Sequence, residues 1–173
     1  PPGSAASVEV AQVTPLREQV PEVVRVTNPV ARAAFFTGDS LNYFYPDAGR
    51  DLIEVLTANN VEVHIPRGQN CCGVPVLVHG DVDTVRALAR NNIDVFEATG
   101  CDYLITGCGS CGGAWQHDYT ELLASDPVYG PKAEKWAGRT YDISTFLTRI
   151  ISLRPPRGRI DKVVTYHDSC HLK

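Results

Sequence analysis

The sequence predicts an α/β fold: a parallel sheet with helices on both faces and cysteine loops at the C-terminal strand ends. Short apolar segments typical of buried strands alternate along the chain with longer segments whose apolar residues recur at helical spacing. In open α/β sheets, the loops that follow the strands meet along one edge, where ligands bind. Five of the six cysteines follow predicted strands, so the fold itself predicts one shared cysteine site.

Each strand and helix of the first half has its own signal. Residues 33–36 are an apolar run that forms the first strand, and Pro46 suits the first turn of a helix that extends to about residue 59. Apolar and polar residues alternate over 61–65, the second strand. Asp81 is a good N-cap for the next helix, which extends to about residue 100.

The second half of the chain continues this alternation. Residues 102–106 form a third strand, and a helix is expected over about 114–124. Asp126-Pro127 and Gly130-Pro131 are expected to break the chain, and Asp142 to cap a further helix. The apolar run 163–166 predicts a last strand.

The composition is that of a globular domain. The 173 residues are 43% hydrophobic and 21% charged, enough for one domain with its own core. A net charge of −4 gives no electrostatic case for binding nucleic acid or an anionic membrane. No apolar run approaches the roughly 20 residues that span a bilayer, and no secretory signal is visible. Six clustered cysteines favour reduced thiols in the cytoplasm over the three disulfides of a secreted scaffold.

Two motifs carry the candidate chemistry: Cys71-Cys72-Gly73 and Cys108-Gly109-Ser110-Cys111. Thiolates are soft ligands that suit iron–sulfur clusters and zinc. Two residues separate Cys108 from Cys111, so one tight turn can present both sulfurs to one centre. Glycines around this pair leave amide N–H groups free to hydrogen-bond to sulfur. We therefore expect the four thiols to meet and bind an iron–sulfur cluster, against the alternatives of a redox dithiol or ordinary buried cysteines.

The spacing of the two motifs resembles that of the cysteine-rich CCG domain family. That family includes one of the subunits of heterodisulfide reductase and the iron–sulfur subunits of glycolate oxidase, anaerobic glycerol-3-phosphate dehydrogenase and lactate-utilisation complexes. The segments 35–38, 45–46, 66–69 and 166–171 look most like the glycolate and lactate branch. The resemblance covers residues 32–173 and implies a 4Fe-4S cluster, in a cubane or a non-cubane form, with zinc as the alternative.

The resemblance implies an electron-transfer domain of a cytoplasmic oxidoreductase complex. The domain would relay electrons from a flavin-containing dehydrogenase subunit that oxidises a 2-hydroxy acid such as glycolate or lactate. A ferredoxin-like module belongs to the same implied complex, and these partners would supply any peripheral association with a membrane. The alternatives are a catalytic cluster that cleaves or forms disulfides, as in heterodisulfide reductase, and a zinc-stabilised interaction domain. The chain has no GxGxxG motif after a strand for a nucleotide of its own.

The sequence departs from the family pattern at Asp39. The family motif begins with a cysteine after the first strand, and here Asp39 stands at that position, with 31 residues between it and Cys71. A carboxylate is a harder ligand than a thiolate, so Asp39 is either a ligand that shifts the potential or a turn or helix-cap residue. Cys170 is the natural fifth thiol of the site, unless it serves a second copy of the domain. Cys101, at the start of a strand, is expected to be a buried structural thiol.

Three segments are expected along the chain. Residues 1–31 are a proline-rich linker or an arm over another domain, with a disordered tail as the alternative. Residues 32–160 form the cysteine-rich domain. Because proteins of this family usually carry two such domains in tandem, residues 161–173 look like the last strand and the start of a truncated second copy. We therefore expect the chain to be one cysteine-rich domain of a larger protein.

Overall fold

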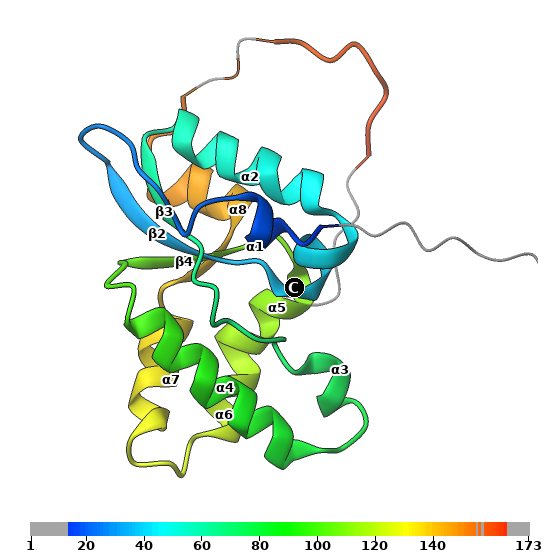
Figure 1. The fold of residues 1–173 in the computed structure, drawn as a ribbon, viewed down its shortest axis with the longest axis vertical. Coiled ribbons are helices and arrows are strands. Elements are labelled where there is room, and N and C mark those ends of the chain that lie inside the picture. The colour runs from blue at the N-terminus through cyan, green and yellow to red at the C-terminus, as the bar shows by residue number, and fades with distance from the viewer. Residues whose placement is uncertain (1–13, 155, 157, 166–173) are drawn as a thin grey trace, which may run out of the picture.

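A mostly parallel sheet forms the centre of the protein (Figure 1). The computed structural model describes residues 14–154, 156 and 158–165. Within them, five strands pair in the order β1-β3-β2-β4-β5, and all neighbouring pairs are parallel except β1 and β3. The strands are β1 (Val23–Val24), β2 (Ala31–Phe36), β3 (Val61–His64), β4 (Tyr103–Thr106) and β5 (Thr140–Asp142). The predicted α/β class with a parallel sheet is confirmed.

The central strand β2 is apolar on both of its faces. Ala34 and Phe36 belong to one core, which they share with residues of α4 (Val82–Glu97) and of the helices after it. Ala33 and Phe35 belong to a second core, shared with α2, the helix between β2 and β3. A strand that is buried on both faces is typical of a parallel sheet covered by helices.

Helices cover the sheet on both faces, as predicted. α2 (Pro46–Ala58) and α8 (Ile143–Thr145) lie over one face, whereas α4, α6 (Tyr119–Leu122) and α7 (Tyr129–Ala137) lie over the other (Figure 1). α8 continues directly into the π-helix η3 (Phe146–Ile150). The protein is therefore built of three layers with one apolar core on each side of the sheet. None of the helices that the structure describes is both long enough and apolar enough to cross a bilayer.

Polar side chains fix the predicted helix starts. Asp81 accepts a hydrogen bond from the Thr84 backbone N–H at 3.1 Å and caps α4. Asp142 accepts hydrogen bonds from the backbone N–H groups of Ser144 and Thr145 at 2.9 and 3.0 Å and caps α8. The first residue of α2 is likewise the predicted proline. These helix starts are confirmed.

Helix α7 and strand β5 are missing from the prediction, which treats Gly130-Pro131 as a break in the chain. Pro131 lies in the first turn of α7, where a proline costs no hydrogen bond because the first N–H groups of a helix have no partner within it. Asp126 accepts hydrogen bonds from the backbone N–H groups of Val128 and Tyr129, both at 3.0 Å, and so satisfies the helix start. The predicted break at Gly130-Pro131 is therefore wrong.

Residues 14–31, more than half of the expected linker or arm, pack on this domain. Leu16 of α1 (Leu16–Gln19) is fully buried. It lies so close to Gly49 of α2 that a Cβ atom on Gly49 would stand 2.3 Å from Leu16 Cδ2. β1 adds an antiparallel strand beside β3 at the sheet edge. The linker expectation is thus corrected for residues 14–31. The composition of this segment does not reveal that it packs against α2 and β3, which lie far along the chain. Residues 1–13 lie outside the described part.

The last predicted strand does not form over its described residues. Residues 163–165 have no strand partner within the described part of the chain, and Val163 and Val164 are exposed. An apolar run becomes a strand only when a neighbouring strand satisfies its backbone N–H and C=O groups. Tyr166 and the segment after it lie outside the described residues.

Candidate metal centre

The loops that follow β2, β3 and β4 surround one cavity of about 230 Å³. Residues from all of these loops line it: Asp39, Ser40, Cys71, Cys72, Val74, Pro75, Val78, Cys108, Ser110 and Cys111. The chain passes from β2 to β3 on one side of β2 and then crosses to β4 on the other side of β2. In open α/β sheets, ligands bind at such a point, where the strand order reverses. Asp39 and the cysteines of both motifs thus lie at one cavity, whereas Cys170 is outside the described residues.

The Cys71-Cys72-Gly73 loop follows β3 and leads into α3 (Val74–Leu77). Gly73 has a φ of +91°, and a Cβ atom there would lie 2.9 Å from Val85 Cγ1, so only glycine suits this turn. The turn directs the Gly73 N–H to Cys71 Sγ at 3.4 Å. Cys72 is buried and Cys71 is half-buried, so the two neighbouring sulfurs differ in their access to solvent.

The second motif begins a helix, where the sequence predicts a tight turn. Cys108 is the N-cap and Cys111 lies in the first turn of α5 (Gly109–Gly113), which continues through η2 (Ala114–Asp118) into α6. The first backbone N–H groups of a helix have no partner within it. Those of Ser110 and Cys111 help to lower the pKa of the Cys108 thiol. The expected tight turn is corrected, and the helix start presents both sulfurs to the cavity.

Gly38 and Asp39 form another side of the cavity, directly after β2. Gly38 has a φ of +54°, and a Cβ atom there would lie 2.8 Å from Cys111 Sγ. Asp39 precedes the π-helix η1 (Ser40–Phe44) and makes no side-chain capping hydrogen bond to it in the described structure. Asp39 instead lines the cavity and is among the groups that raise the pKa of the Cys71 thiol. Asp39 therefore stands at the N-cap position without a capping side-chain hydrogen bond, and its role as a ligand stays a prediction.

Hydrogen bonds within the cavity lower the pKa values of two thiols. The pKa of Cys108 falls to about 5, first through a hydrogen bond with the Cys111 thiol and then through the backbone N–H groups of Cys111 and Ser110. The pKa of Cys72 is also lowered, chiefly by hydrogen bonding with Cys111. Cys72 and Cys108 are therefore the thiols that ionise most readily.

The other two thiols of the cavity hold their protons. Burial, followed by the hydrogen bond to Asp39, raises the pKa of Cys71 to about 12. Hydrogen bonds with Cys108 and Cys72, and then burial, raise the pKa of Cys111 well above its usual range. Thiolates are the ligating form of cysteine, so binding of a metal centre here must release these protons.

The residues around the cavity fit an iron–sulfur cluster. Four thiols supply soft ligands. The Gly73 backbone N–H donates to the Cys71 sulfur at 3.4 Å, as is typical around such clusters, and the N–H groups of Ser110 and Cys111 help to lower the pKa of the Cys108 thiol. Among the residues that the structure describes, no three Cys, His, Asp or Glu side chains are arranged to hold a single metal ion. The thiols instead surround a cavity with room for a multinuclear core.

Comparison with known proteins places this arrangement in a family. Residues 33–115 match the family model CCG, described as a cysteine-rich domain. The matched segment contains Asp39 and the cysteines of both motifs. The chain contains a CCG cysteine-rich domain. The family that the motif spacing predicts is therefore confirmed.

Several curated proteins are similar to this cysteine-rich domain. Lactate utilization protein A of Halalkalibacterium halodurans is 34% identical over 129 residues, which are 75% of this chain and 52% of that protein. An uncharacterized iron-sulfur protein of Methanocaldococcus jannaschii is 34% identical over 166 residues, 95% of this chain and 30% of the relative. One of the subunits of fumarate reductase (CoM/CoB) from Methanothermobacter marburgensis is 40% identical over 148 residues, 84% of this chain and 27% of the relative. The chain thus spans about half of the first relative and less of the other two.

Sequence reasoning missed Gln69, which joins two loops of the cysteine-rich domain. Its side chain is 3% exposed. Gln69 Oε1 accepts hydrogen bonds from the Thr37 backbone N–H at 2.9 Å and the Thr37 hydroxyl at 3.2 Å. Its Nε2 donates to the carbonyl oxygens of Phe35 and Pro66 at 3.2 and 3.0 Å. Gln69 therefore fixes the loop that leads to Cys71 against the end of β2.

Sequence reasoning also missed Asn92, a fully buried residue of α4. It lies on the apolar stripe of this helix, in register with Val85, Ala89 and Phe96. An asparagine on a buried helical stripe is a signal in the sequence itself, because a buried amide needs hydrogen-bond partners. The partners of Asn92 are the backbone of the cysteine loop and Tyr119.

Cys101 of the cysteine-rich domain stands apart from the cavity. It is 6% exposed, and its backbone N–H donates to the Thr99 hydroxyl at 3.2 Å. Burial raises the pKa of its thiol. Cys101 precedes β4, whereas the cavity lies at the other end of that strand. The prediction that Cys101 is a buried thiol away from the site is confirmed.

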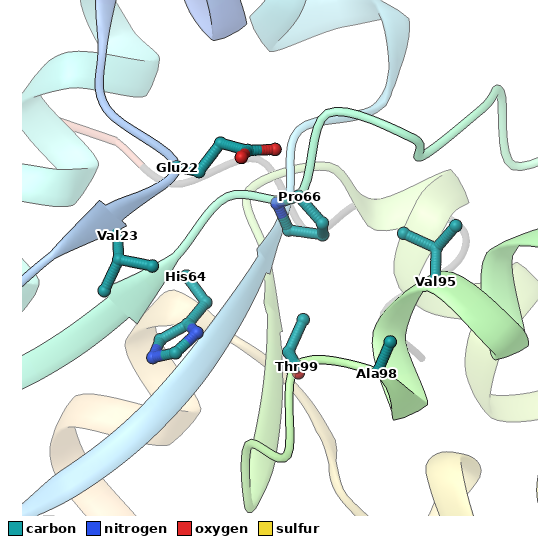
Figure 2. A pocket seen from close by; sticks show the side chains of 7 residues that line it. All are labelled: Glu22, Val23, His64, Pro66, Val95, Ala98 and Thr99. Carbon is teal, nitrogen blue, oxygen red and sulfur yellow. The ribbon is translucent and has the colours of Figure 1, made fainter.

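A second cavity, of about 200 Å³, lies beside β1, β3 and the end of α4 (Figure 2). It is lined by Glu22, Val23, His64, Pro66, Val95, Ala98 and Thr99. Its polar side chains already have protein partners: Glu22 Oε1 accepts from the Arg67 backbone N–H at 3.0 Å, and His64 Nε2 pairs with Glu62 Oε1 at 2.8 Å. The cysteine cavity is therefore the stronger candidate site.

Proposed function

We propose that this cysteine-rich domain holds an iron–sulfur cluster and transfers electrons within an oxidoreductase complex. The observation that supports this most strongly is the convergence of Cys71, Cys72, Cys108 and Cys111 on one cavity, with the Gly73 backbone N–H directed at the Cys71 sulfur. When bound, such a cluster supplies reversible one-electron transfer at a potential set by its ligands, its hydrogen bonds and its burial. The name of one relative, an iron-sulfur protein, supports the same function.

We propose a 4Fe-4S cluster, in a cubane or a non-cubane form, with the four cavity cysteines as its ligands. Asp39 lines the same cavity as Cys71 and is among the groups that raise the pKa of its thiol, which supports its placement near the metal. Carboxylate oxygen is a harder ligand than thiolate sulfur, so ligation by Asp39 would distinguish this site from one with five thiols. Cys170 remains the predicted fifth thiol, at this site or at a second copy of the domain.

The proposed partners are a flavin-containing dehydrogenase subunit that oxidises a 2-hydroxy acid and a ferredoxin-like module of the same cytoplasmic complex. The name of one relative, lactate utilization protein A, supports this branch of the family. Exposed apolar residues in segments that contribute to the cavity lining support a contact with the flavin subunit. Val78 lines the cavity and is 75% exposed, and Phe44, which ends η1, is 73% exposed. Large exposed apolar side chains of this kind are typical of binding surfaces.

A second candidate function is catalysis at the cluster, with cleavage or formation of a disulfide. The half-buried Cys71 and the space within the cavity favour it, since a substrate must reach the metal centre. The two functions differ in one measurable property: catalysis requires a small disulfide or thiol to perturb the spectrum of the cluster, whereas pure electron transfer does not.

Metal and sulfide analysis of anaerobically purified chain tests the proposal. We expect iron and acid-labile sulfide in similar amounts, with visible absorbance that bleaches on reduction. One zinc per chain without visible absorbance would instead establish the zinc-stabilised interaction domain. Electron paramagnetic resonance spectra recorded with and without an added disulfide would then separate electron transfer from catalysis.

A further inference from the structure

Two buried side chains reach from the helical layer to the backbone of the Cys71-Cys72 loop. Asn92 Nδ2 donates hydrogen bonds to the Cys71 carbonyl oxygen and to Tyr119 Oη, both at 3.1 Å. Tyr119 Oη donates to the Cys72 carbonyl oxygen at 2.9 Å. Asn92 Oδ1 accepts from the Asn70 backbone N–H at 2.8 Å. Because Asn92 and Tyr119 are fully buried, water does not compete for these hydrogen bonds.

The carbonyl group that Tyr119 holds belongs to the peptide group between Cys72 and Gly73. The N–H of that same peptide group donates to Cys71 Sγ at 3.4 Å. A peptide group is planar, so a fixed C=O direction also fixes the N–H direction. The hydrogen bonds therefore form one continuous chain from Asn92, through Tyr119 and this peptide group, to the Cys71 sulfur.

Packing alone does not explain the hydroxyl group of Tyr119. The tyrosine ring lies against Trp115 in an apolar core, with the ring centroids 5.0 Å apart, and phenylalanine would fill the same space. A buried hydroxyl costs free energy unless it is hydrogen-bonded. Here the hydroxyl both donates to the cysteine loop and accepts from Asn92. The buried hydroxyl therefore has a protein partner for each of these hydrogen bonds.

We propose that Asn92 and Tyr119 are positioning residues that set the strength of the N–H···S hydrogen bond to Cys71 and thereby tune the reduction potential of the bound cluster. This inference rests on the proposed iron–sulfur function. Hydrogen bonds in a chain polarise one another, and N–H donors to the sulfurs stabilise the additional negative charge of the reduced state. Removal of the Tyr119 hydroxyl weakens the last hydrogen bond of the chain and makes reduction less favourable.

A redox titration of the variant Tyr119→Phe in the full chain tests the proposal, because phenylalanine keeps the ring and removes the hydroxyl. We expect a more negative midpoint potential. At a fixed applied potential, the ratio of reduced to oxidised cluster should fall about twofold to tenfold, the range that corresponds to one net hydrogen bond. Tyr129→Phe is the matched control, since Tyr129 Oη donates to Asp94 at 2.7 Å on the exposed surface, and it should keep the wild-type potential.

Hydrogen exchange of the Gly73 amide, followed by nuclear magnetic resonance in the metal-free chain, gives a second readout. We expect faster exchange in Tyr119→Phe than in the wild type or in Tyr129→Phe. Unchanged exchange, or an iron-loaded Tyr119→Phe chain with the wild-type potential, would overturn the inference. A wild-type chain that binds no iron would overturn the proposed function itself, so the two failures are distinguishable.

Discussion

At the scale of single residues, two separate constraints exclude a side chain at position 38, where the residue is Gly38. Its φ of +54° is a conformation that favours glycine. A Cβ atom would also meet the sulfur of Cys111 at 2.8 Å, closer than a real Cβ contact allows. The first constraint concerns the backbone, and the second concerns the candidate ligand itself.

Gly38→Ala should therefore lower both stability and iron content. A non-glycine residue with positive φ costs about 1–3 kcal/mol, and the new methyl group displaces Cys111. Gly100→Ala is the matched control, because Gly100 has a similar φ of +63° and no atom near its Cβ position. We expect denaturant unfolding to show a loss of stability in both variants, and iron analysis to show a loss of metal in Gly38→Ala alone. Equal iron in the two variants would contradict the placement of Cys111 at the metal.

Asp39 is the residue at which the sequence is expected to depart from the family pattern. It lines the cavity and is among the groups that raise the pKa of the Cys71 thiol. We expect Asp39→Cys to change the electron paramagnetic resonance spectrum of the cluster, because a soft thiolate replaces a hard carboxylate beside the metal. A spectrum identical to that of the wild type would show that Asp39 is not near the metal.

At the scale of elements, α1 ties the start of the described chain to the cysteine loop. Leu16 fills the core against α2, and Arg17 Nη1 donates to the carbonyl oxygens of Arg67 and Gln69 at 3.0 and 2.5 Å. The Gln69–Asn70 peptide group, whose N–H donates to Asn92, is therefore held from both sides of the loop. A short helix thus supports a ligand loop that lies far from it in the sequence.

Arg17→Ala should destabilise the domain by about 1.5–3 kcal/mol, the usual range for hydrogen bonds that involve a charged group. We also expect faster loss of the cluster on exposure to a chelator, since the cysteine loop loses one of its supports. Arg25→Ala, at an exposed arginine of the same segment, serves as the control for the loss of charge. Similar chelation rates in both variants would argue against a role of α1 in the site.

The contact between α4 and α7 predicts how stability depends on pH. The pKa of Asp126 is held below its usual range, first by the backbone N–H groups of Tyr129 and Val128 and then by Arg90. A carboxyl group whose pKa is lowered by folding stabilises the protein above its unfolded pKa, and this contribution is lost as the pH falls through the folded pKa. An unfolded aspartate titrates at about pH 3.9.

We therefore expect the melting temperature of the wild type to fall steeply below about pH 4. Asp126→Asn should lose less stability over the same interval, because it removes one of the groups that titrates. Thermal unfolding of both chains from about pH 6 down to about pH 2 measures the difference. Parallel curves for the two chains would show that Asp126 does not contribute to acid denaturation.

At the scale of the whole molecule, the sequence predicts the sheet and the meeting of the cysteines for the same reason. β2, β3 and β4 have clear strand patterns, and parallel strands bring the loops at their carboxyl ends to one edge. Once the strands are placed, the convergence of Cys71, Cys72, Cys108 and Cys111 follows without any knowledge of the metal.

Features that depend on contacts between distant segments escaped prediction. Leu16 docks on Gly49, and Pro131 fits α7 only because Asp126 satisfies the helix start. In the sequence, nothing distinguishes the side chains that support the site, such as Tyr119, from ordinary helix residues. Their role depends on the three-dimensional position of the Cys72 carbonyl group, which no local pattern specifies.

The central claim is that sulfurs from two distant loops share one inorganic centre, and the iron content of single cysteine variants tests it most directly. Cys72, Cys111 and Cys101 are similarly buried, at 5%, 4% and 6% exposed, so the three serine variants disturb packing to a similar extent. We predict that Cys72→Ser and Cys111→Ser lose iron and visible absorbance, whereas Cys101→Ser keeps both. Iron retained at the wild-type level in Cys72→Ser and Cys111→Ser would contradict the account.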